Sequence, residues 1–577
     1  MKRSRQLTRL LIGAAAVAIL PWTAAQAAAS GNGATGAVPG ECSQAAIQAL
    51  APADTTITSA EIVSTPVSNC KVEGYVTTTN PGPNKVNFRL QLPSQGWQNR
   101  YYFIGMGGAA GYVPTDSQIP AGNPLFKGFA VAGTDTGHTG AMLDWSFMGK
   151  SKAQAMDHID RGAHVVAVAT QQITKRHYKT DKLYRYHCGC SGGGRMGVMA
   201  IERHPEDFDG VLLGAPGGRS SATMIKFIVA AQESMREPGS WVSPAKLVMT
   251  EAKVTAACDA TDGAVDGIVA DHRLCKFDVA TLACTGPNGA ECLTQPEIVT
   301  IKSIIRGPLG PDGKPLTEGM PITNMSTWAG FVGMTPPPWP TDPNEVMRGK
   351  GSSGLVIANT LAQSYFGPDY DAAKQFDSRN PDHIKAWREA AVRLDYGQPY
   401  TANLRGFQQS GGKLILYNGV SDACCSDVEL EQYYHDAGKF VAGGPRALPK
   451  FIRYYRVPGM AHCGGGTGPG DAPDQMLESL IAWVERGKAP AEIVAHRGAD
   501  RVQLQFADPK TKMVSGVLVP PPSGPSRDFL LCPLPQVAVF NGSSAPNAVF
   551  EASNWSCKAS RTVKLSAAGV SDRMAAD

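Results

Sequence analysis

A serine framed by glycines constrains this chain more than any other feature. The run His-Cys-Gly-Cys-Ser-Gly-Gly-Gly-Arg places Gly189, Ser191 and Gly193 in the pattern G-x-S-x-G. This pattern is typical of a nucleophile elbow, a strained turn between a strand and a helix that lifts a serine hydroxyl above a sheet. The strand-like residues 183–186 precede it, and residues 196–202 can continue as a helix. Because the chain contains 63 glycines, the pattern alone is weak, and its context must decide.

The first 27 residues read as an export signal. Basic residues precede the apolar segment Leu10–Leu20, and Ala25-Gln26-Ala27 forms a small-residue cleavage site. The apolar segment is shorter than the roughly 20 residues that a bilayer requires, which argues against a membrane anchor. We therefore predict a signal peptide over residues 1–27, a mature chain that starts near Ala28, and a secreted or periplasmic location.

The length and charge of the chain limit its number of domains and its possible partners. At 577 residues it is too long for one ordinary domain, which indicates two or three domains or one catalytic domain with a large insertion. The 54 basic residues exceed the 50 acidic ones by four and form no basic block of the kind that follows a nucleic-acid backbone. We expect neither nucleic acid nor, after signal removal, a membrane as partner. The sequence leaves the oligomeric state open.

The 13 cysteines gain meaning from the predicted export, because an oxidising compartment lets thiols pair. Proximity along the chain suggests four disulfides, although sequence alone does not determine the connectivity. The suggested pairs are Cys42 with Cys70, Cys258 with Cys275, Cys284 with Cys292, and Cys532 with Cys557. Five cysteines remain, and at least one of them must stay free or pair outside the chain: Cys188, Cys190, Cys424, Cys425 and Cys463.

Strands and helices alternate through two separated parts of the chain. Apolar runs predict buried strands, and residues 155–178 carry apolar residues at helical spacing. The predicted strands cover residues 101–104, 128–133, 183–186, 208–216, 412–419 and 451–455, with an amphipathic helix at 474–487. This alternation predicts a parallel α/β sheet. It stops over residues 217–404, where we expect an inserted lid with scattered helices, so the sheet domain divides into residues 28–216 and 405–577.

A serine nucleophile needs a base that takes its proton and an acid that orients the base. After a nucleophile elbow these residues follow in the chain order Ser, Asp, His. Asp422 and His462 each follow a predicted strand, so both lie at strand ends on the side expected for Ser191. The plainer interpretations are a turn-capping aspartate and a surface histidine. Two further acids could replace Asp422 in this role: Asp427 and Glu429.

Cysteines flank two of these candidates. Cys190 directly precedes Ser191, and Cys463 directly follows His462. A hydrogen bond between His462 and Ser191 would bring the two cysteines within bridging range. We therefore predict a Cys190–Cys463 disulfide that joins the two catalytic loops.

The ordered set of Cys-Ser, Asp and His-Cys is similar to the signature of the tannase and feruloyl esterase family, and the resemblance covers nearly the whole mature chain. It implies an α/β-hydrolase fold with a large inserted lid domain. An oxyanion hole needs the N–H of Gly192, the residue after the nucleophile, and a second donor. The resemblance implies that this donor comes from the early glycine loop, where Gly108 is preferred to Gly107. Three cysteines depart from the family pattern and leave open an extra bridge near the active site or a reactive thiol: Cys188, Cys424 and Cys425.

An acidic loop in the predicted lid indicates a cation. Three aspartates lie within eight residues directly after Cys258, and they would repel one another unless a hard cation such as Ca²⁺ lay among them. The loop is not an EF-hand, because Ala270 stands where the last glutamate would be. It resembles the structural calcium site of the family; a solvated acidic turn is the alternative. The resemblance implies the side chains of Asp259, Asp262 and Asp266 and the carbonyls of Ala264 and Ile268 as ligands.

We predict a secreted serine carboxylesterase that works through an acyl-enzyme. The resemblance implies an aromatic acyl group, hydroxycinnamoyl or galloyl. The first alternative is a hydrolase of aromatic dicarboxylate monoesters such as mono(2-hydroxyethyl) terephthalate, which needs a basic residue over the acyl pocket. A peptidase and a calcium-stabilised binding protein have less support, because nothing indicates a peptide groove and every catalytic position is filled. Lid residues that could meet a ring or a carboxylate are Trp241, Trp328, Phe331, Trp339, Arg348 and Lys350.

Overall fold

The computed structural model describes most of the chain after its first 39 residues. The described ranges are 40–114, 124–217, 222–395, 400–498, 506–507, 514–515 and 524–559. The predicted signal peptide over residues 1–27 lies outside them. Within the described ranges, no helix is both long enough and apolar enough to cross a membrane.

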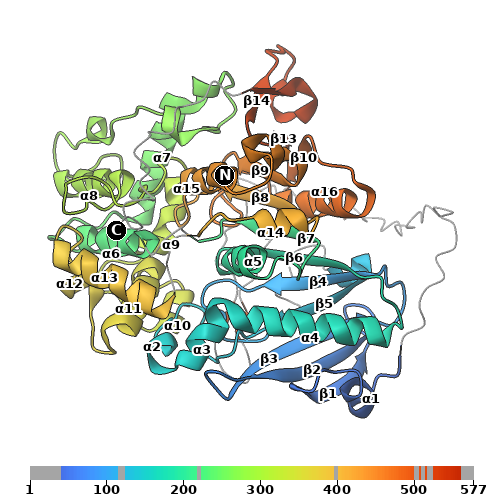
Figure 1. The fold of residues 1–577 in the computed structure, drawn as a ribbon. Helices are drawn as coiled ribbons and strands as arrows, with labels where there is room; N and C mark the ends of the chain where they lie inside the picture. The colour runs from blue at the N-terminus through green and yellow to red at the C-terminus, as the bar shows by residue number, and fades with distance from the viewer. Residues whose placement is uncertain are drawn as a thin grey trace, which may run out of the picture. The chain divides into compact units, whose positions relative to one another are not determined.

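The main sheet of the fold is mixed and has nine strands within the described residues (Figure 1). Its strands are β1 (Thr55–Val63), β2 (Asn69–Thr78), β3 (Asn84–Pro93), β4 (Arg100–Gly105), β5 (Phe129–Thr134), β6 (Tyr184–Cys190), β7 (Gly210–Gly214), β8 (Lys413–Gly419) and β9 (Ile452–Val457). Their order is β1-β2-β3-β5-β4-β6-β7-β8-β9. Pairing is antiparallel from β1 to β5 and parallel from β5 to β9. The predicted parallel α/β sheet is therefore present.

The burial of the strands matches their sequences. Along β2, buried residues alternate with partly exposed ones, as expected for an antiparallel strand with one covered face. In contrast, β5 and β7 are buried at every residue, because helices cover both faces of the parallel part. The strand before the elbow is longer than predicted: β6 continues beyond Tyr186 to Cys190, so the sheet reaches the serine directly.

Helices on opposite faces cover the parallel strands. The long ones are α4 (Gly162–His177), α5 (Gly192–Arg203) and α16 (Ala472–Arg486). In β7, neighbouring residues point to opposite faces. A side chain at Gly197 of α5 would collide with Leu213, whereas one at Gly210 would meet Val484 of α16. Because Gly210 and Leu213 have opposite parity in the strand, α5 and α16 lie on different faces of the sheet, and α4 packs beside α5.

The helix predicted over residues 155–178 is interrupted. The structure has α3 (Lys152–Met156), a single π-helical turn over Asp157–Arg161, and then α4. Asp157 is fully buried, and its carboxylate accepts hydrogen bonds from Thr78 at 2.8 Å and Asn84 at 2.7 Å. The π turn thus positions Asp157 so that its carboxylate binds the β2–β3 hairpin.

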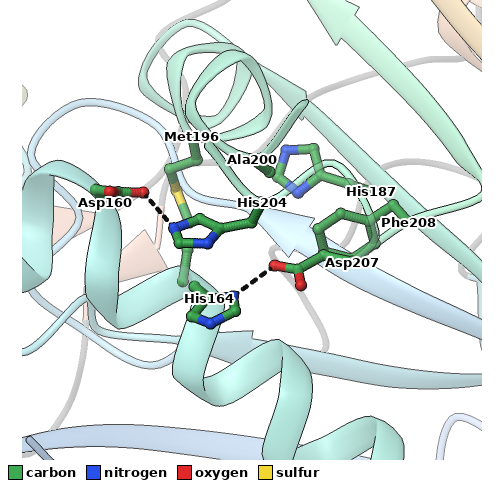
Figure 2. Close-up of a pocket in the computed structure, with 9 residues that line it drawn as sticks. Asp160, His164, His187, Met196, Ala200, His204, Asp207 and Phe208 are labelled. Carbon is green, nitrogen blue, oxygen red and sulfur yellow. Dashed lines mark hydrogen bonds and ion pairs between the residues drawn. The ribbon is translucent and has the colours of Figure 1, made fainter. Parts of the chain in front are cut away.

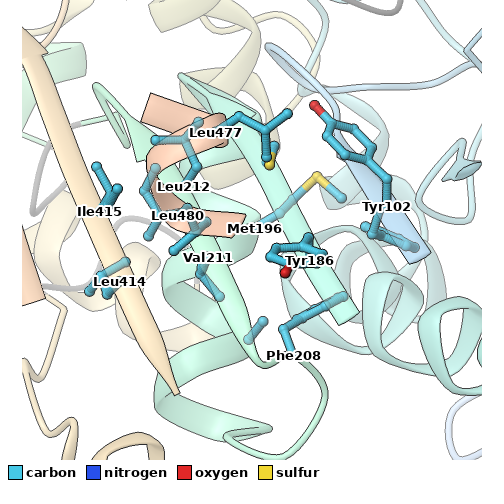
Figure 3. Close-up of a cluster of buried hydrophobic side chains, with 14 of the residues drawn as sticks. Tyr102, Tyr186, Met196, Phe208, Val211, Leu212, Leu414, Ile415, Leu477 and Leu480 are labelled. Carbon is cyan, nitrogen blue, oxygen red and sulfur yellow. The ribbon is translucent and has the colours of Figure 1, made fainter. Parts of the chain in front are cut away.

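The core lies between the sheet and these helices. Figure 3 shows side chains from β6, β7 and β8 packed against residues of α16. Members of this cluster include Tyr102, Tyr186, Met196, Phe208, Val211, Leu212, Leu414, Ile415, Leu477 and Leu480. Removing one such leucine side chain would cost about 2–5 kcal/mol, because a void would remain. The ends of β6 and β8, where the catalytic candidates lie, are therefore held by a densely packed interior.

The region predicted as a lid is richer in helix than the expected scattered stretches. It contains α6 (Ala222–Ser234), α7 (Pro244–Cys258), α8 (Gln295–Arg306), α9 (Ala329–Val332), α10 (Pro343–Met347), α11 (Ser353–Phe366), α12 (Ala372–Gln375) and α13 (Pro381–Leu394). These helices surround a second hydrophobic cluster with Trp328 and Trp387 at its centre. That cluster also includes Leu143 and Met148 from the first part of the chain, which carries α2 (Phe147–Lys150). The domain boundaries at residues 216 and 404 stay predictions.

Short elements and disulfides complete the description. Besides short 3-10 helices, the remaining α-helices and strands are α1 (Gln44–Gln48), α14 (Arg405–Gln409), α15 (Asp427–Ala437), β10 (Ile493–Arg497), β11 (Phe506–Ala507), β12 (Val514–Ser515), β13 (Arg527–Leu531), β14 (Gln536–Phe540) and β15 (Trp555–Ala559). The strands from β10 onward pair in antiparallel couples. The four disulfides suggested by proximity are confirmed: Cys42–Cys70, Cys258–Cys275, Cys284–Cys292 and Cys532–Cys557.

Candidate active site

Ser191 occupies a strained turn between β6 and α5. Its φ of 59° and ψ of −123° lie in a region that non-glycine residues rarely adopt. The turn is held by the Ser191 N–H, which donates to the Gly214 carbonyl at 3.0 Å. A Cβ on Gly189 would lie 2.5 Å from the Gly193 carbonyl, so glycine is required at this close approach. The glycines of the motif therefore allow the elbow geometry that the sequence predicts.

Asp422 and His462 meet at the ends of β8 and β9. His462 Nδ1 lies 2.9 Å from Asp422 Oδ2. Asp422 is buried, and its Oδ1 also accepts the backbone N–H groups of Cys424 at 2.8 Å and Cys425 at 2.9 Å. Burial opposes protonation of the ring, but the charge of Asp422 outweighs it and raises the pKa of His462 above its ordinary value. An imidazole oriented in this way is suited to take and return a proton.

The two alternative acids have other partners. Asp427 binds Arg456 and His272, with an Nε–Oδ2 distance of 2.8 Å to Arg456. Glu429 accepts a hydrogen bond from Thr317. Among the three acids weighed from the sequence, Asp422 is thus the one that the structure places against His462.

The predicted disulfide between Cys190 and Cys463 is present. The two sulfur atoms are 2.07 Å apart and the Cα atoms 5.9 Å apart. Ser191 and His462 are the immediate chain neighbours of these cysteines, so the covalent bridge brings the elbow and the histidine loop to one place. This juxtaposition connects the three candidate residues, which are up to 271 positions apart in the chain (462 − 191).

Replacing both Cys190 and Cys463 with alanine is expected to lower stability and rate together. Loss of a long-range disulfide costs about 2–5 kcal/mol, and a shift of about 1 Å between reacting groups costs about 100-fold in rate. Thermal unfolding and kcat on a chromogenic ester measure the two effects. As a matched control, the double alanine variant of Cys42 and Cys70 should lose stability while the folded enzyme keeps its kcat. Unchanged kcat in the first variant would contradict a positioning role for the bridge.

The candidate oxyanion residues lie side by side. A Cβ built on Gly192 would lie 2.8 Å from the Gly108 nitrogen and 2.3 Å from its carbonyl oxygen. Gly108 has a φ of +57°, and a side chain there would collide with Met142. Gly107 has neither constraint, because its surroundings leave room for a side chain. The backbone of Gly192, which follows Ser191 in the chain, is thus in close contact with the backbone of Gly108.

The lid reaches the site through an aromatic pair. The ring of Phe331, on α9, lies edge to face against the His462 ring with centroids 5.9 Å apart. It stacks on Phe227 of α6 at 5.3 Å and an interplanar angle of 1°. Phe331 was one of several aromatic residues that the sequence offered, and its contact with the histidine singles it out.

Other contacts between the lid and the site have no clear sequence signal. Asn324 and Thr323 hydrogen-bond Ser421, the neighbour of Asp422, at 2.8 Å each. Lys226 is buried and donates to the Cys424 carbonyl at 2.8 Å. These polar contacts fasten the lid to the loop that carries the acid.

The remaining lid candidates serve packing or the surface. Trp328 is fully buried in the lid core, and its indole N–H donates to the Pro321 carbonyl at 3.1 Å. Trp241 and Trp339 likewise donate to carbonyls within the lid. The two basic candidates, Arg348 and Lys350, both pair with Glu345 at the surface.

A polar cluster lies beneath α5, away from the elbow (Figure 2). It consists of Asp160, His164, His204 and Asp207. His204 Nε2 lies 2.9 Å from Asp160, His164 Nδ1 lies 2.9 Å from Asp207, and the two imidazole rings stack at 3.8 Å. The hydrogen bond that His164 donates to the Asp207 carboxylate raises the pKa of His164. Because His204 caps the end of α5, this cluster anchors the helix that carries Ser191 at its start.

The acidic loop folds around its own aspartates. Asp259 accepts N–H groups from Asp266, Gly267 and Ile268 at 2.9–3.2 Å. Asp266 also pairs with Arg527 of β13 at 2.7 Å, and both side chains are buried. Burial raises the pKa of Asp262 to about 6, and repulsion from the two other aspartates adds to the effect. Three carboxylates and one guanidinium leave two uncompensated negative charges, which matches the charge of one divalent cation.

Comparison with known proteins decides the family. The family model described as tannase and feruloyl esterase matches residues 70–558. The chain belongs to the tannase and feruloyl esterase family. Like other members it is a carboxylic ester hydrolase, and the resemblance drawn from Ser191, Asp422 and His462 is thereby confirmed at the level of the family.

Relatives of known name support this membership. The mono(2-hydroxyethyl) terephthalate hydrolase of Piscinibacter sakaiensis is 30% identical over 550 residues, which cover 85% of each chain. Feruloyl esterase B of Aspergillus niger is 28% identical and covers 74% of this chain and 79% of its own. Among solved structures, an esterase from Aspergillus oryzae has a TM-score of 0.71 at 24% identity, over 88% of this chain and 97% of its own. Feruloyl esterase B from the same organism has a TM-score of 0.69 at 22% identity, covering 89% and 98%. The predicted α/β-hydrolase fold is confirmed.

Proposed function

We propose that this esterase uses Ser191 as nucleophile, His462 as general base and acid, and Asp422 as the residue that orients the histidine. The observation that carries the proposal is the Asp422–His462 pair, joined to the Ser191 elbow by the Cys190–Cys463 disulfide. The order of the three residues and the strand ends that carry them match the hydrolase arrangement.

The reaction follows from these positions. His462 accepts the Ser191 proton while the hydroxyl oxygen attacks the ester carbonyl, and the N–H groups of Gly192 and Gly108 stabilise the negative oxygen of the tetrahedral intermediate. His462 then gives its proton to the leaving alcohol, which produces the acyl-enzyme. Water, deprotonated by the same imidazole, attacks the acyl carbonyl and releases the acid. Asp422 stays ionised and stabilises the positive ring that forms twice in each cycle.

We propose esters of aromatic acids, hydroxycinnamoyl or galloyl, as substrates. The support is Phe331, a partly buried ring that stacks on the fully buried Phe227 and lies next to the His462 ring. Aromatic rings pack well against such a ring, whereas a short aliphatic acyl group gains little from it. The names of feruloyl esterase relatives point to the same substrate class.

A substrate comparison tests this proposal. Methyl ferulate, methyl gallate, a terephthalate monoester and methyl acetate would be compared by kcat/KM. The proposal expects one of the first two to exceed methyl acetate by about 100-fold, since burying an aromatic ring against Phe331 contributes about 2–3 kcal/mol. Equal values for aromatic and acetyl esters would contradict it.

The terephthalate relative supports a second candidate, the hydrolysis of aromatic dicarboxylate monoesters. That reaction needs a cation over the acyl pocket. Arg348 and Lys350 pair with Glu345 at the surface, and the buried Lys226 donates to the Cys424 carbonyl, so each of these three cations already has a partner. The feruloyl or galloyl reading is therefore preferred, and a dominant rate with the terephthalate monoester would reverse the preference.

We further propose that the acidic loop binds a structural Ca²⁺ and that the chain is exported. The residue set fits a hard cation: three buried or partly buried carboxylates, two of them with a raised pKa, and a net local charge of minus two after Arg527 is counted. The proposed ligands are the side chains of Asp259, Asp262 and Asp266 and the carbonyls of Ala264 and Ile268.

The five disulfides support the proposal that the chain is exported, because such bonds persist in oxidising compartments.

Chelation of calcium is expected to lower thermal stability and to leave the chemistry of the folded enzyme intact. At a calcium concentration 100 times Kd, binding contributes about 2.7 kcal/mol to unfolding free energy. Thermal unfolding with EGTA and with added CaCl₂ measures this difference. Asp262→Asn should abolish the response, whereas Asp312→Asn, on an exposed lid turn, should retain it. An unfolding temperature that is independent of calcium in the parent protein would refute the site.

A further inference from the structure

Two adjacent thiols lie beside the catalytic acid. All 13 cysteines fall within the described residues, ten of them form disulfides, and Cys188 is buried in β6 beside Tyr102. The other two, Cys424 and Cys425, have their sulfur atoms 3.0 Å apart, against about 2.05 Å for a disulfide bond. Cys425 is buried and Cys424 is half-buried. In an oxidising compartment each of these two thiols therefore has the other as its ready partner.

The peptide group between these cysteines is part of the support of the acid. The N–H of Cys425 donates to Asp422 Oδ1 at 2.9 Å, and the carbonyl of Cys424 accepts from Lys226 at 2.8 Å. Ligand atoms of Asp422, Cys424, Cys425 and His462 all lie within 4.8 Å of one another. Any rotation of this peptide would therefore change how Asp422 is held.

We propose that Cys424 and Cys425 form a redox modification site at which a small-molecule disulfide, of the glutathione type, closes a vicinal disulfide and thereby slows ester hydrolysis. Adjacent Cα atoms are about 3.8 Å apart, less than the 4.4–6.8 Å usual for bridged cysteines. Closing the ring must therefore rotate the shared peptide. The Cys425 N–H then turns away from Asp422, and the carboxylate loses one of the donors that hold it against His462.

The exchange balances in two steps. The more accessible Cys424 sulfur, as thiolate, attacks the added disulfide, forms a mixed disulfide and releases one thiol. The Cys425 sulfur then attacks the Cys424 sulfur and expels the second thiol. Two electrons pass from the cysteine pair to the added disulfide, and the two cysteine protons end on the two released thiols.

Intact mass and rate of the full chain test the inference. After oxidised glutathione, the protein should lose about 2 Da relative to the form in which Cys424 and Cys425 are free and the five other disulfides are intact, with the change mapped to the peptide containing Cys424 and Cys425. We expect kcat to fall about tenfold and to recover with dithiothreitol. In a plot of rate against pH, the rise on the acid side should move to lower pH in the oxidised form. A loosened Asp422 stabilises the charged form of His462 less and so lowers its pKa. Mass is read without any substrate, so it remains informative even if the proposed catalytic roles fail.

Variants separate this site from other thiols. Cys424→Ser and Cys425→Ser keep both backbone N–H donors and should show neither the mass loss nor the change in rate. Cys188→Ala removes the third free thiol and should keep both responses. Three free thiols after oxidation, or a stable glutathione adduct without ring closure, would overturn the site. A wild-type mass loss without a change in rate or pH profile would overturn its coupling to Asp422.

Discussion

Replacing Ser191 with alanine is expected to lower kcat by about 10⁶-fold, because the hydroxyl that forms the acyl-enzyme is gone. The fold should persist. Alanine keeps the Cβ that already occupies the strained turn at a φ of 59°, so the substitution adds no backbone strain. Steady-state hydrolysis of a chromogenic ester gives kcat, and mass spectrometry after mixing with a slow ester detects the acyl-enzyme on Ser191.

A remote serine provides the matched control. Ser243 caps the start of α7, where its side chain accepts the Lys246 N–H. Ser243→Ala should cost about 0.5–2 kcal/mol of stability and leave kcat of the folded enzyme unchanged. An acyl group found elsewhere on the chain, or full activity of Ser191→Ala, would refute the assignment of the nucleophile.

The parallel strands were predictable from the sequence, whereas the short helices of the predicted lid were not, for physical reasons. An apolar run of five or six residues bounded by glycine, such as β5 or β7, suits a buried strand and little else. In the lid, α9, α10 and α12 are only four or five residues long, too short for a helical period to be read. The π turn at Asp157 depends on a carboxylate that reaches another hairpin, and such a partner has no local signature.

In the candidate active site, too, some features were predictable from the sequence and others were not. The residues Ser191, Asp422 and His462 follow recognisable strands, so their order and strand ends predict a meeting point. The cysteines beside Ser191 and His462 predict a disulfide between the two loops, and the structure contains it. The groups that hold Asp422 are backbone N–H donors of Cys424 and Cys425, and every residue type except proline supplies such donors, so the sequence carries little sign of them. The contact between the lid and the histidine depends likewise on packing between distant segments.

Asp422→Asn is expected to lower kcat by about 10⁴-fold. An asparagine amide presents an N–H where the carboxylate accepted one, which favours the wrong tautomer of His462. The pH profile should change as well. His462 acts as a base only when neutral, so the rate rises as pH rises through its pKa. The Asp422 charge contributes most to raising that pKa, so the pKa should fall without it and the acid side of the profile should move to lower pH.

Asp427→Asn is the control that distinguishes orientation from simple loss of a buried charge. Burial would raise the pKa of Asp427, but Arg456 and His272 lower it to about 2. A carboxyl whose pKa falls on folding stabilises the protein above its unfolded pKa, and that contribution is lost as the pH falls through the folded value. The variant should therefore lose stability at neutral pH, measured by urea unfolding. Its kcat should stay within about twofold of the parent, and the acid side of its pH profile should stay at the same pH. If Asp427→Asn instead reproduced the rate loss and the displaced acid side of the profile, and Asp422→Asn did not, the acid would be Asp427 and the histidine loop would have to reorganise during catalysis.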